Sequence, residues 1–333
     1  MKNKILILGG TGFSGRILTE EILKTDFDLT LFNRGKRNPG IFPEVKRIVG
    51  DRETDDIKQI SRSSWDTVID FSGMQPVNIE LIMEMMKGKI GRYIFVSTAN
   101  VYPLESSNLK FPINEEAEIL PCSEEQKLTK DVISAYGNKK AECERILLAN
   151  DWLDVIIFRP GLIYGRYDWS DRFYYWLFRA KTQKQILIPE NGKSKATNTF
   201  SEDFAKIILE AIAIKKHSKV YNAVTHKKPV SIKEIIEIAC TFLKTSPNLI
   251  NAPVEFLREN NVTEWMDLPM WIHEVDLIMD NTRLSNDFKT PRCTFEESVD
   301  KSISYFGSLG WNEGKYGLKL ERERNLIKKL TGD

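Results

Sequence analysis

The sequence of 333 residues is poor in the patterns that mark disulfide-rich and metal-binding proteins. The four cysteines lie far apart in the chain, and none of them forms a CxxC pair. Metal sites and disulfide frameworks need close, paired spacings, so we expect reduced thiols and no metal ion. The three histidines are equally scattered. The cysteines are Cys122, Cys143, Cys240 and Cys293.

The chain also lacks an excess of charge of one sign. Its 48 Lys and Arg residues balance 47 Asp and Glu residues, which leaves a net charge of +1. This balance gives no electrostatic reason to expect nucleic acid or a membrane surface as a partner. No apolar run approaches the ~18 residues of a membrane span, and the first residues do not have the pattern of a signal peptide. We therefore expect a soluble, cytoplasmic protein.

What is present is an alternation of strand and helix patterns along the first half of the chain. The strands are apolar runs without alternation, which is typical of strands buried on both faces. Strands and helices in this order predict an α/β fold with a Rossmann-type, doubly wound parallel sheet. The predicted strands are Lys4–Leu8, Leu29–Phe32, Arg47–Val49, Thr67–Phe71, Arg92–Val96 and Val155–Phe158; the helices are Phe13–Lys24, Asn78–Met86 and Lys130–Leu148.

The rhythm breaks after Gly165, where segments rich in Trp, Tyr, Arg and Pro begin. We predict a Rossmann domain over residues 1–165, to which 196–224 return. Residues 166–195 and 225–333 are predicted to form a smaller α+β lobe that binds substrate. Open α/β folds bind ligands at the carboxyl edge of the sheet, so we expect the lobe there.

The first strand runs into a glycine-rich turn with the spacing Gly10-x-Gly12-x-x-Gly15. Between a strand and a helix, this spacing is the fingerprint of a dinucleotide-binding turn, whose free N–H groups and helix dipole favour a diphosphate. The segment predicted to contact the dinucleotide comprises Gly9, Gly10, Thr11, Gly12, Phe13, Ser14 and Gly15.

The end of the second predicted strand favours NADP over NAD. An Asp or Glu normally binds the adenosine ribose of NAD at this position, and here there is none. Cations suit a 2′-phosphate instead, although a solvated basic loop is an alternative and NAD stays possible. The residues in question are Asn33, Arg34, Lys36 and Arg37.

Two further strand ends are predicted to contribute to the cofactor site. Asp51 and Arg52 follow the third strand, where an acid can accept a hydrogen bond from the adenine amino group. A helix N-cap is an alternative role for Asp51. Ser72 and Gly73 follow the fourth strand and would let the backbone pass close beneath the adenosine.

Tyr136 and Lys140 are four residues apart at the start of a predicted helix, which places them on one face. A nearby ammonium stabilises a phenolate, so this pair can act as an acid/base. A hydroxyl at the end of the fifth strand would hold the substrate oxygen. We choose Thr98 for this role, with Ser97 as the alternative.

The ordered set of motifs resembles the extended (atypical) short-chain dehydrogenases/reductases, the NAD-dependent epimerase/dehydratase family. Three stretches are similar to a bacterial subgroup called 2′-hydroxyisoflavone reductase-like, which is related to chloroplast stem-loop-binding proteins. The family motifs are Gly9–Gly15, Val96–Tyr102, Tyr136 with Lys140, and Arg159–Gly165; the subgroup stretches are Phe32–Gly35, Asp168–Phe173 and Leu268–Trp271.

The resemblance implies that Tyr136 is the general acid/base and that Thr98 orients the substrate. Lys140 would bind the nicotinamide ribose and lower the pKa of Tyr136. Pro160, Gly161 and Leu162 would lie beside the nicotinamide.

Two departures from the family pattern reduce the range of reactions that we expect the chain to catalyse. Sugar-nucleotide dehydratases carry Asp-Glu after the catalytic threonine, where this chain has Ala99-Asn100. Nucleotide-sugar enzymes commonly carry an asparagine at the position of Leu162. We therefore favour an NAD(P)-dependent reductase or dehydrogenase of a small molecule. The alternatives are a sugar epimerase and a non-catalytic dinucleotide-binding sensor or RNA-binding protein.

The aromatic and basic run after Gly165 is predicted to contact substrate, because such loops beside a cofactor can grip an anion. An aromatic core, with Arg172 paired to Asp168 or Asp171, is the alternative. Family resemblance also implies a homodimer through the helices at 78–86 and 130–148. The predicted substrate residues are Arg166, Arg172 and Tyr175.

Overall fold

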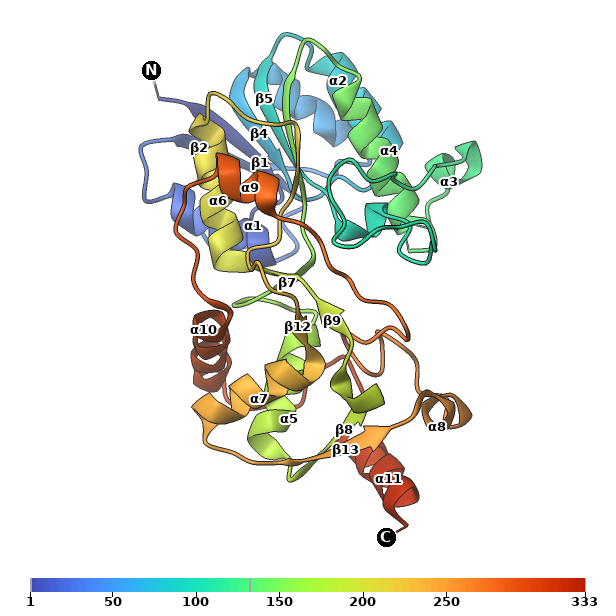
Figure 1. The fold of residues 1–333 in the computed structure, drawn as a ribbon. Coiled ribbons are helices and arrows are strands. Elements are labelled where there is room, and N and C mark those ends of the chain that lie inside the picture. The colour runs from blue at the N-terminus through green and yellow to red at the C-terminus, as the bar shows by residue number, and fades with distance from the viewer. Residues whose placement is uncertain (1, 132, 333) are drawn as a thin grey trace. The chain divides into compact units, whose positions relative to one another are not determined.

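A computed structural model describes residues 2–131 and 133–332, and the chain divides into two compact units (Figure 1). The first unit contains Met1–Gly161, Ser201–Thr225 and Met279–Pro291. The second contains Leu162–Phe200, His226–Ile278 and Arg292–Asp333. This division differs from the predicted one chiefly at 279–291, a segment that the sequence prediction had assigned to the smaller lobe.

The segment at 279–291 belongs to the first unit because its short helix α9 (Thr282–Asp287) docks on the last strand, β11 (Val220–Asn222). The Tyr221 hydroxyl donates to Asp287 Oδ2 at 2.6 Å, and Asn281 Nδ2 donates to the Val224 carbonyl at 3.0 Å. Nothing in the local pattern of 279–291 signals these long-range partners.

A parallel sheet of seven strands, counted over the described residues, forms the first unit in the order β11-β6-β5-β4-β1-β2-β3. The Rossmann-type α/β prediction is confirmed. The remaining strands are β1 (Lys4–Leu8), β2 (Asp28–Asn33), β3 (Lys46–Val49), β4 (Trp65–Asp70), β5 (Ile90–Val96) and β6 (Asp154–Arg159).

Helices cover both faces of this sheet, which explains why its strands are apolar throughout (Figure 1). Helix α1 packs on α6, and α2 packs on α4. In register, Leu8 pairs with Phe32 on one side and with Asp70 on the other. The carboxyl ends of β1, β2 and β4 are therefore level, and the loops after them gather at one edge. The helices are α1 (Phe13–Ile22), α2 (Pro76–Met85), α4 (Tyr136–Leu148) and α6 (Ser201–Ala213).

Helix α4 begins six residues later than the sequence predicts, and a separate short helix, α3 (Glu124–Leu128), precedes it. The Asp131 carboxylate accepts hydrogen bonds from the backbone N–H groups of Ile133 and Ser134. Such local side-chain bonds compete with helix formation, so the chain turns before the helix starts. As a result Tyr136 lies in the first turn of α4.

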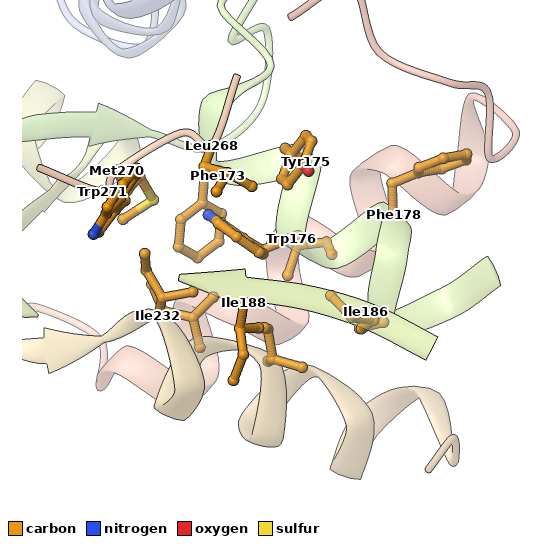
Figure 2. Packing of buried hydrophobic residues seen from close by; sticks show 14 of the residues in the cluster. Phe173, Tyr175, Trp176, Phe178, Ile186, Ile188, Ile232, Leu268, Met270 and Trp271 are labelled. Atoms are coloured by element: carbon orange, nitrogen blue, oxygen red, sulfur yellow. The ribbon is translucent and has the colours of Figure 1, made fainter. Parts of the chain in front are cut away.

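The second unit is held together by an aromatic core (Figure 2). The Trp176 indole donates to the Pro269 carbonyl at 2.9 Å, and Trp271 is 1% exposed. Arg179 and Glu323 form a buried ion pair at 3.0 Å that ties α11 to α5. The elements are β7 (Leu162–Tyr164), α5 (Arg172–Thr182), β8 (Gln185–Pro189), β9 (Lys195–Ala196), β10 (Asn198–Phe200), β12 (Val230–Ser231), α7 (Ile232–Leu243), β13 (Asn248–Ala252), α8 (Val254–Glu259), α10 (Phe295–Ser308) and α11 (Leu320–Thr331).

Among residues 2–131 and 133–332, every helix is too short or too polar to cross a membrane. The same residues contain no group of three or more His, Cys, Asp or Glu side chains that could hold a metal ion.

Candidate functional site

The turn between β1 and α1 requires glycine at two positions. Gly10 has a φ of +86°, a backbone conformation that residues with a Cβ rarely adopt. A Cβ on Gly15 would lie 2.9 Å from the Gly10 backbone nitrogen, so the helix could not approach the turn as closely. The Thr19 hydroxyl donates to the Gly10 carbonyl at 2.9 Å and fixes the turn from behind.

Helix α1 leaves its first N–H groups available to a ligand. Gly12 is its N-cap residue and offers no side chain to accept a hydrogen bond from these groups. Because no acidic side chain occupies the first turn either, the helix N-terminus is suited to an anion such as a diphosphate.

A pocket of about 780 Å³ lies over this turn, within the first unit. Its volume is in the range of small-molecule sites. Of the predicted cofactor residues, Gly10, Phe13, Ser14 and Gly15 shape the turn without lining the pocket. Those that line it are Gly9, Thr11, Gly12, Asn33, Arg34, Lys36, Arg37, Asp51, Arg52 and Ser72, whereas Gly73, Ser97, Tyr136, Lys140, Pro160, Gly161 and Leu162 are not among its lining residues.

The basic rim of the pocket is built differently from the sequence expectation. The end of β2 itself has no carboxylate. However, Asp51 Oδ2 lies 3.9 Å from Arg34 Nη1, so the two side chains form an ion pair. Arg37 lies over the glycine turn, since a Cβ on Gly12 would be 2.9 Å from its Cδ. Asn38, which the sequence did not single out, donates from Nδ2 to the Thr11 carbonyl at 2.8 Å.

Arg52 is anchored beneath the pocket by charged and polar partners. Its Nη1 donates to Asp70 Oδ1 at 2.8 Å and to the Ser72 hydroxyl at 2.9 Å. Despite burial, the guanidinium and the hydrogen bond from the Tyr93 hydroxyl lower the pKa of Asp70. The alternative of Asp51 as a helix N-cap is incorrect, because Thr54 caps the following 3₁₀-helix.

Tyr136 and Thr98 come together at the carboxyl end of β5. The Thr98 hydroxyl accepts from the Asn100 backbone N–H at 3.2 Å, and its interaction with Tyr136 acts on the pKa of the phenol. Burial raises the pKa of Tyr136, and the hydrogen bond with Thr98 lowers it only in part. This differs from the expected lowering by Lys140, which is not among the groups acting on the phenol.

The Lys140 amine is directed toward the backbone rather than toward the phenol. Its Nζ donates to the Gly73 carbonyl at 2.8 Å and to the Val96 carbonyl at 2.7 Å. It also lies 3.8 Å from the centre of the Phe95 ring. Burial lowers the pKa of Lys140 to about 8.

Ser97, the alternative to Thr98, is already engaged. Its hydroxyl donates to Glu144 Oε1, and Arg159 Nη2 donates to Glu144 Oε2 at 2.6 Å. The carbonyl of Pro160 accepts from the Ala99 N–H at 2.8 Å, which ties the end of β6 to the same turn. These bonds fix the backbone on both sides of Thr98.

Gly161 ends the first stretch of the first unit, and the remaining predicted residues lie in the second unit. Leu162 belongs to β7 and pairs with Asn198. Arg166 donates to the Tyr167 hydroxyl at 3.1 Å, and the Arg172 guanidinium lies 5.3 Å from the centre of the Trp265 ring. Tyr175 is 2% exposed and packs in the aromatic core shown in Figure 2.

Sequence reasoning missed Gln75 and Lys139. Gln75 lines the pocket, and Lys139 is fully buried with its amine 2.7 Å from Gln75 Oε1. Lys139 adjoins the predicted lysine, and a second cation in the same helical turn was a signal available in the sequence.

A profile of the NAD dependent epimerase/dehydratase family matches residues 5–223. The chain belongs to this family, as its motifs predicted, and at that level the expected enzyme of the extended short-chain dehydrogenase/reductase type is confirmed.

Two curated relatives are similar in sequence to parts of this chain. It is 27% identical over 246 residues, 69% of its length, to the chloroplast stem-loop binding protein of 41 kDa b of Arabidopsis thaliana. It is 26% identical over 172 residues, 43% of its length, to UDP-glucose 4-epimerase of Neisseria meningitidis serogroup C. The matched segments span only 60% and 47% of those relatives' own lengths.

The solved structures support the fold alone, because their sequences are distant. The dTDP-glucose 4,6-dehydratase of Bacillus anthracis, solved with NAD, superposes with a TM-score of 0.70 at 18% identity, over 93% of this chain and 98% of that one. The UDP-glucose 4-epimerase of Thermotoga maritima, solved with UDP-glucose, gives 0.71 at 16% identity, over 92% and 99%.

Gly137→Ala tests the packing that places Tyr136. The new Cβ would lie 2.1 Å from the Asn100 carbonyl oxygen, so the first turn of α4 must move away. We expect a loss of about 2 kcal/mol in the free energy of unfolding, measured with urea. Gly40→Ala, where nothing lies within 4 Å of the new Cβ, is the control. A Gly137→Ala protein as stable as that control would contradict the packing.

Lys140→Met tests the buried amine through the pH dependence of stability. The pKa of Lys140 falls from 10.5 to about 8 on folding, so between these values the unfolded chain binds more protons. Stability should therefore rise with pH in this window, by about 3 kcal/mol in total, and this rise should vanish in Lys140→Met. Urea unfolding at about pH 7.5 and about pH 10 measures it. Lys130→Met, at an exposed position, should keep the rise; equal slopes in all three proteins would refute the assignment.

Proposed function

We propose that the chain is an NAD(P)-dependent oxidoreductase that interconverts a carbonyl and a hydroxyl group of a small molecule. The observation that carries this proposal is that Tyr136 and Thr98, which interact, lie in the same unit as the pocket over the glycine turn. An acid/base tyrosine and a dinucleotide pocket are together what hydride transfer to a carbonyl requires.

The pocket residues fit a nicotinamide dinucleotide. The open N-terminus of α1 suits the diphosphate, and Arg37 over Gly12 adds a cation beside it. When bound, the dinucleotide supplies the hydride acceptor or donor.

In this proposal Tyr136 is the proton donor in the direction of reduction. The phenol, whose pKa burial raises, is protonated at neutral pH and can give its proton to a carbonyl oxygen when a bound ligand stabilises the phenolate that remains. Thr98 holds the same oxygen through its hydroxyl. Lys140, a cation fixed against the carbonyls of Gly73 and Val96, is positioned to bind ribose hydroxyls.

The sequence beside Thr98 favours reduction over dehydration. Ala99 and Asn100 stand where a dehydratase has its acidic pair, so the chain offers no carboxyl group there to remove water. In the second unit, Arg166 and Arg172 are the groups that we propose to recognise an anionic substrate.

UDP-sugar epimerisation is a second candidate, favoured by the similarity to the Neisseria UDP-glucose 4-epimerase. An epimerase returns the hydride to the same substrate and therefore consumes no cofactor. RNA binding is suggested by the name of the Arabidopsis relative, and the net charge of +1 counts against it. Binding of RNA with a steep salt dependence, retained in Tyr136→Phe, would support that third function.

Tyr136→Phe should lower turnover by at least ~100-fold, because the proton donor is lost. It should leave the affinity for the dinucleotide within about twofold, because the pocket is intact. Oxidation of NADPH or NADH with a panel of aldehydes, ketones and UDP-sugars measures the first, and calorimetric titration measures the second. Tyr174→Phe in the second unit, whose hydroxyl donates to the Asn312 carbonyl, is the matched control. Full turnover in Tyr136→Phe would reject the proposed acid/base.

Arg34→Ala tests the choice of cofactor, which we propose to be NADP. Loss of the cation at the rim should weaken NADP binding about tenfold and leave NAD binding nearly unchanged. Calorimetry with both dinucleotides measures this preference. Arg62→Ala, an exposed position outside the pocket, is the control. Equal affinities for NAD and NADP, unaffected by Arg34→Ala, would contradict the NADP proposal.

A further inference from the structure

Helix α4 carries a second buried lysine beside the one that the proposed chemistry uses. Lys139 is 0% exposed, and no carboxylate forms an ion pair with it among the described residues. Its Nζ donates to Gln75 Oε1 at 2.7 Å and to the Thr129 carbonyl. Burial of a lysine on neutral acceptors is costly, so a purely structural role is poorly served by this residue type.

Lys139 fixes the orientation of the Gln75 side-chain amide. A lysine ammonium has only donors, so the group 2.7 Å from it must be the amide oxygen. The amide nitrogen is therefore turned away from Lys139. No described residue accepts a hydrogen bond from it, and it is not enclosed by protein.

Gln75 stands at a defined place in the pocket wall. It is the N-cap residue of α2, and its side chain does not cap that helix. Gln75 and Ser72 both line the pocket, as do residues of the glycine turn and of the basic rim. Gln75 is 9% exposed, so its position is set by packing and by Lys139.

We propose that Lys139 orients Gln75 so that the amide nitrogen donates a hydrogen bond to an oxygen of the bound dinucleotide. The acceptor is a phosphate or a ribose oxygen, since both accept from an amide N–H. This inference rests on the proposed dinucleotide site. Gln75 is then a binding residue, and Lys139 is a positioning residue that acts through it.

Two substitutions of Gln75 distinguish a residue that donates a hydrogen bond to the dinucleotide from one that only holds Lys139. Gln75→Glu keeps an oxygen for Lys139 and removes the N–H donor. Gln75→Met removes both functions and adds no charge. Both proteins should bind the dinucleotide about tenfold more weakly than the unmodified chain. Calorimetric titration with NAD and NADP is the measurement, with circular dichroism to confirm folding.

Every other pattern overturns the inference. Weakening in Gln75→Met alone would mean that the residue only tethers Lys139. Weakening in Gln75→Glu alone would mean charge repulsion, and no change in either would mean no contact. If the unmodified chain binds neither dinucleotide, the proposed function fails instead, so the two failures are distinguishable.

Lys139→Met and shorter ligands complete the test. Lys139→Met leaves the amide in place but free to rotate, and should weaken binding by a smaller factor of about three. ADP and AMP identify the acceptor. If the Gln75 variants bind NAD and ADP more weakly but bind AMP normally, the acceptor is the second phosphate. If they bind all three ligands more weakly, the acceptor is the adenosine ribose or the first phosphate. A loss with the dinucleotide alone assigns it to the nicotinamide ribose. Unchanged binding to Lys139→Met would overturn the positioning role.

Discussion

The contact between Gly137 and the carbonyl of Asn100 is the constraint on which the site depends. Only a residue without a Cβ allows the first turn of α4 to lie against the turn that follows β5. From that turn of helix, Tyr136 reaches Thr98, Lys140 reaches the carbonyls of Gly73 and Val96, and Lys139 reaches Gln75. One close backbone approach therefore positions the proposed acid/base and both buried amines.

Burial of the two lysines, Lys139 and Lys140, costs free energy. Burial disfavours the charged form of Lys140, and backbone carbonyls give it acceptors without full opposite charges. Asp70 and Glu144 offset this only in part by raising the pKa of Lys140, and each also forms a buried ion pair, with Arg52 and with Arg159. The network is not fully satisfied, because Nε and Nη2 of Arg52 are buried without a hydrogen-bond partner among the described residues.

The parallel sheet and the glycine turn were predictable because both are written in local patterns. Apolar runs mark strands buried on both faces, and the glycine spacing marks the turn. What sequence reasoning missed depends on partners distant in the chain. The return of 279–291 to the first unit requires Tyr221 and Val224, and the link from Lys139 to Gln75 spans 64 positions. The late start of α4 had a local cause, in the hydrogen bonds to Asp131, but that side chain competes with an otherwise helical pattern.

Because the pKa of Tyr136 is raised, the stabilisation that proton transfer needs must come from outside the free chain. In the structure neither lysine acts on the phenol, and burial keeps it protonated. Proton donation to a carbonyl oxygen would leave a phenolate, and that phenolate needs stabilisation that arises only when ligand is bound. In the free chain the phenol is protonated, and Thr98, which acts on its pKa, accepts a hydrogen bond from the Asn100 backbone N–H. Because donation and acceptance of the proton pass through the same phenolate, a bound cofactor or substrate has to stabilise that phenolate in either direction of the reaction.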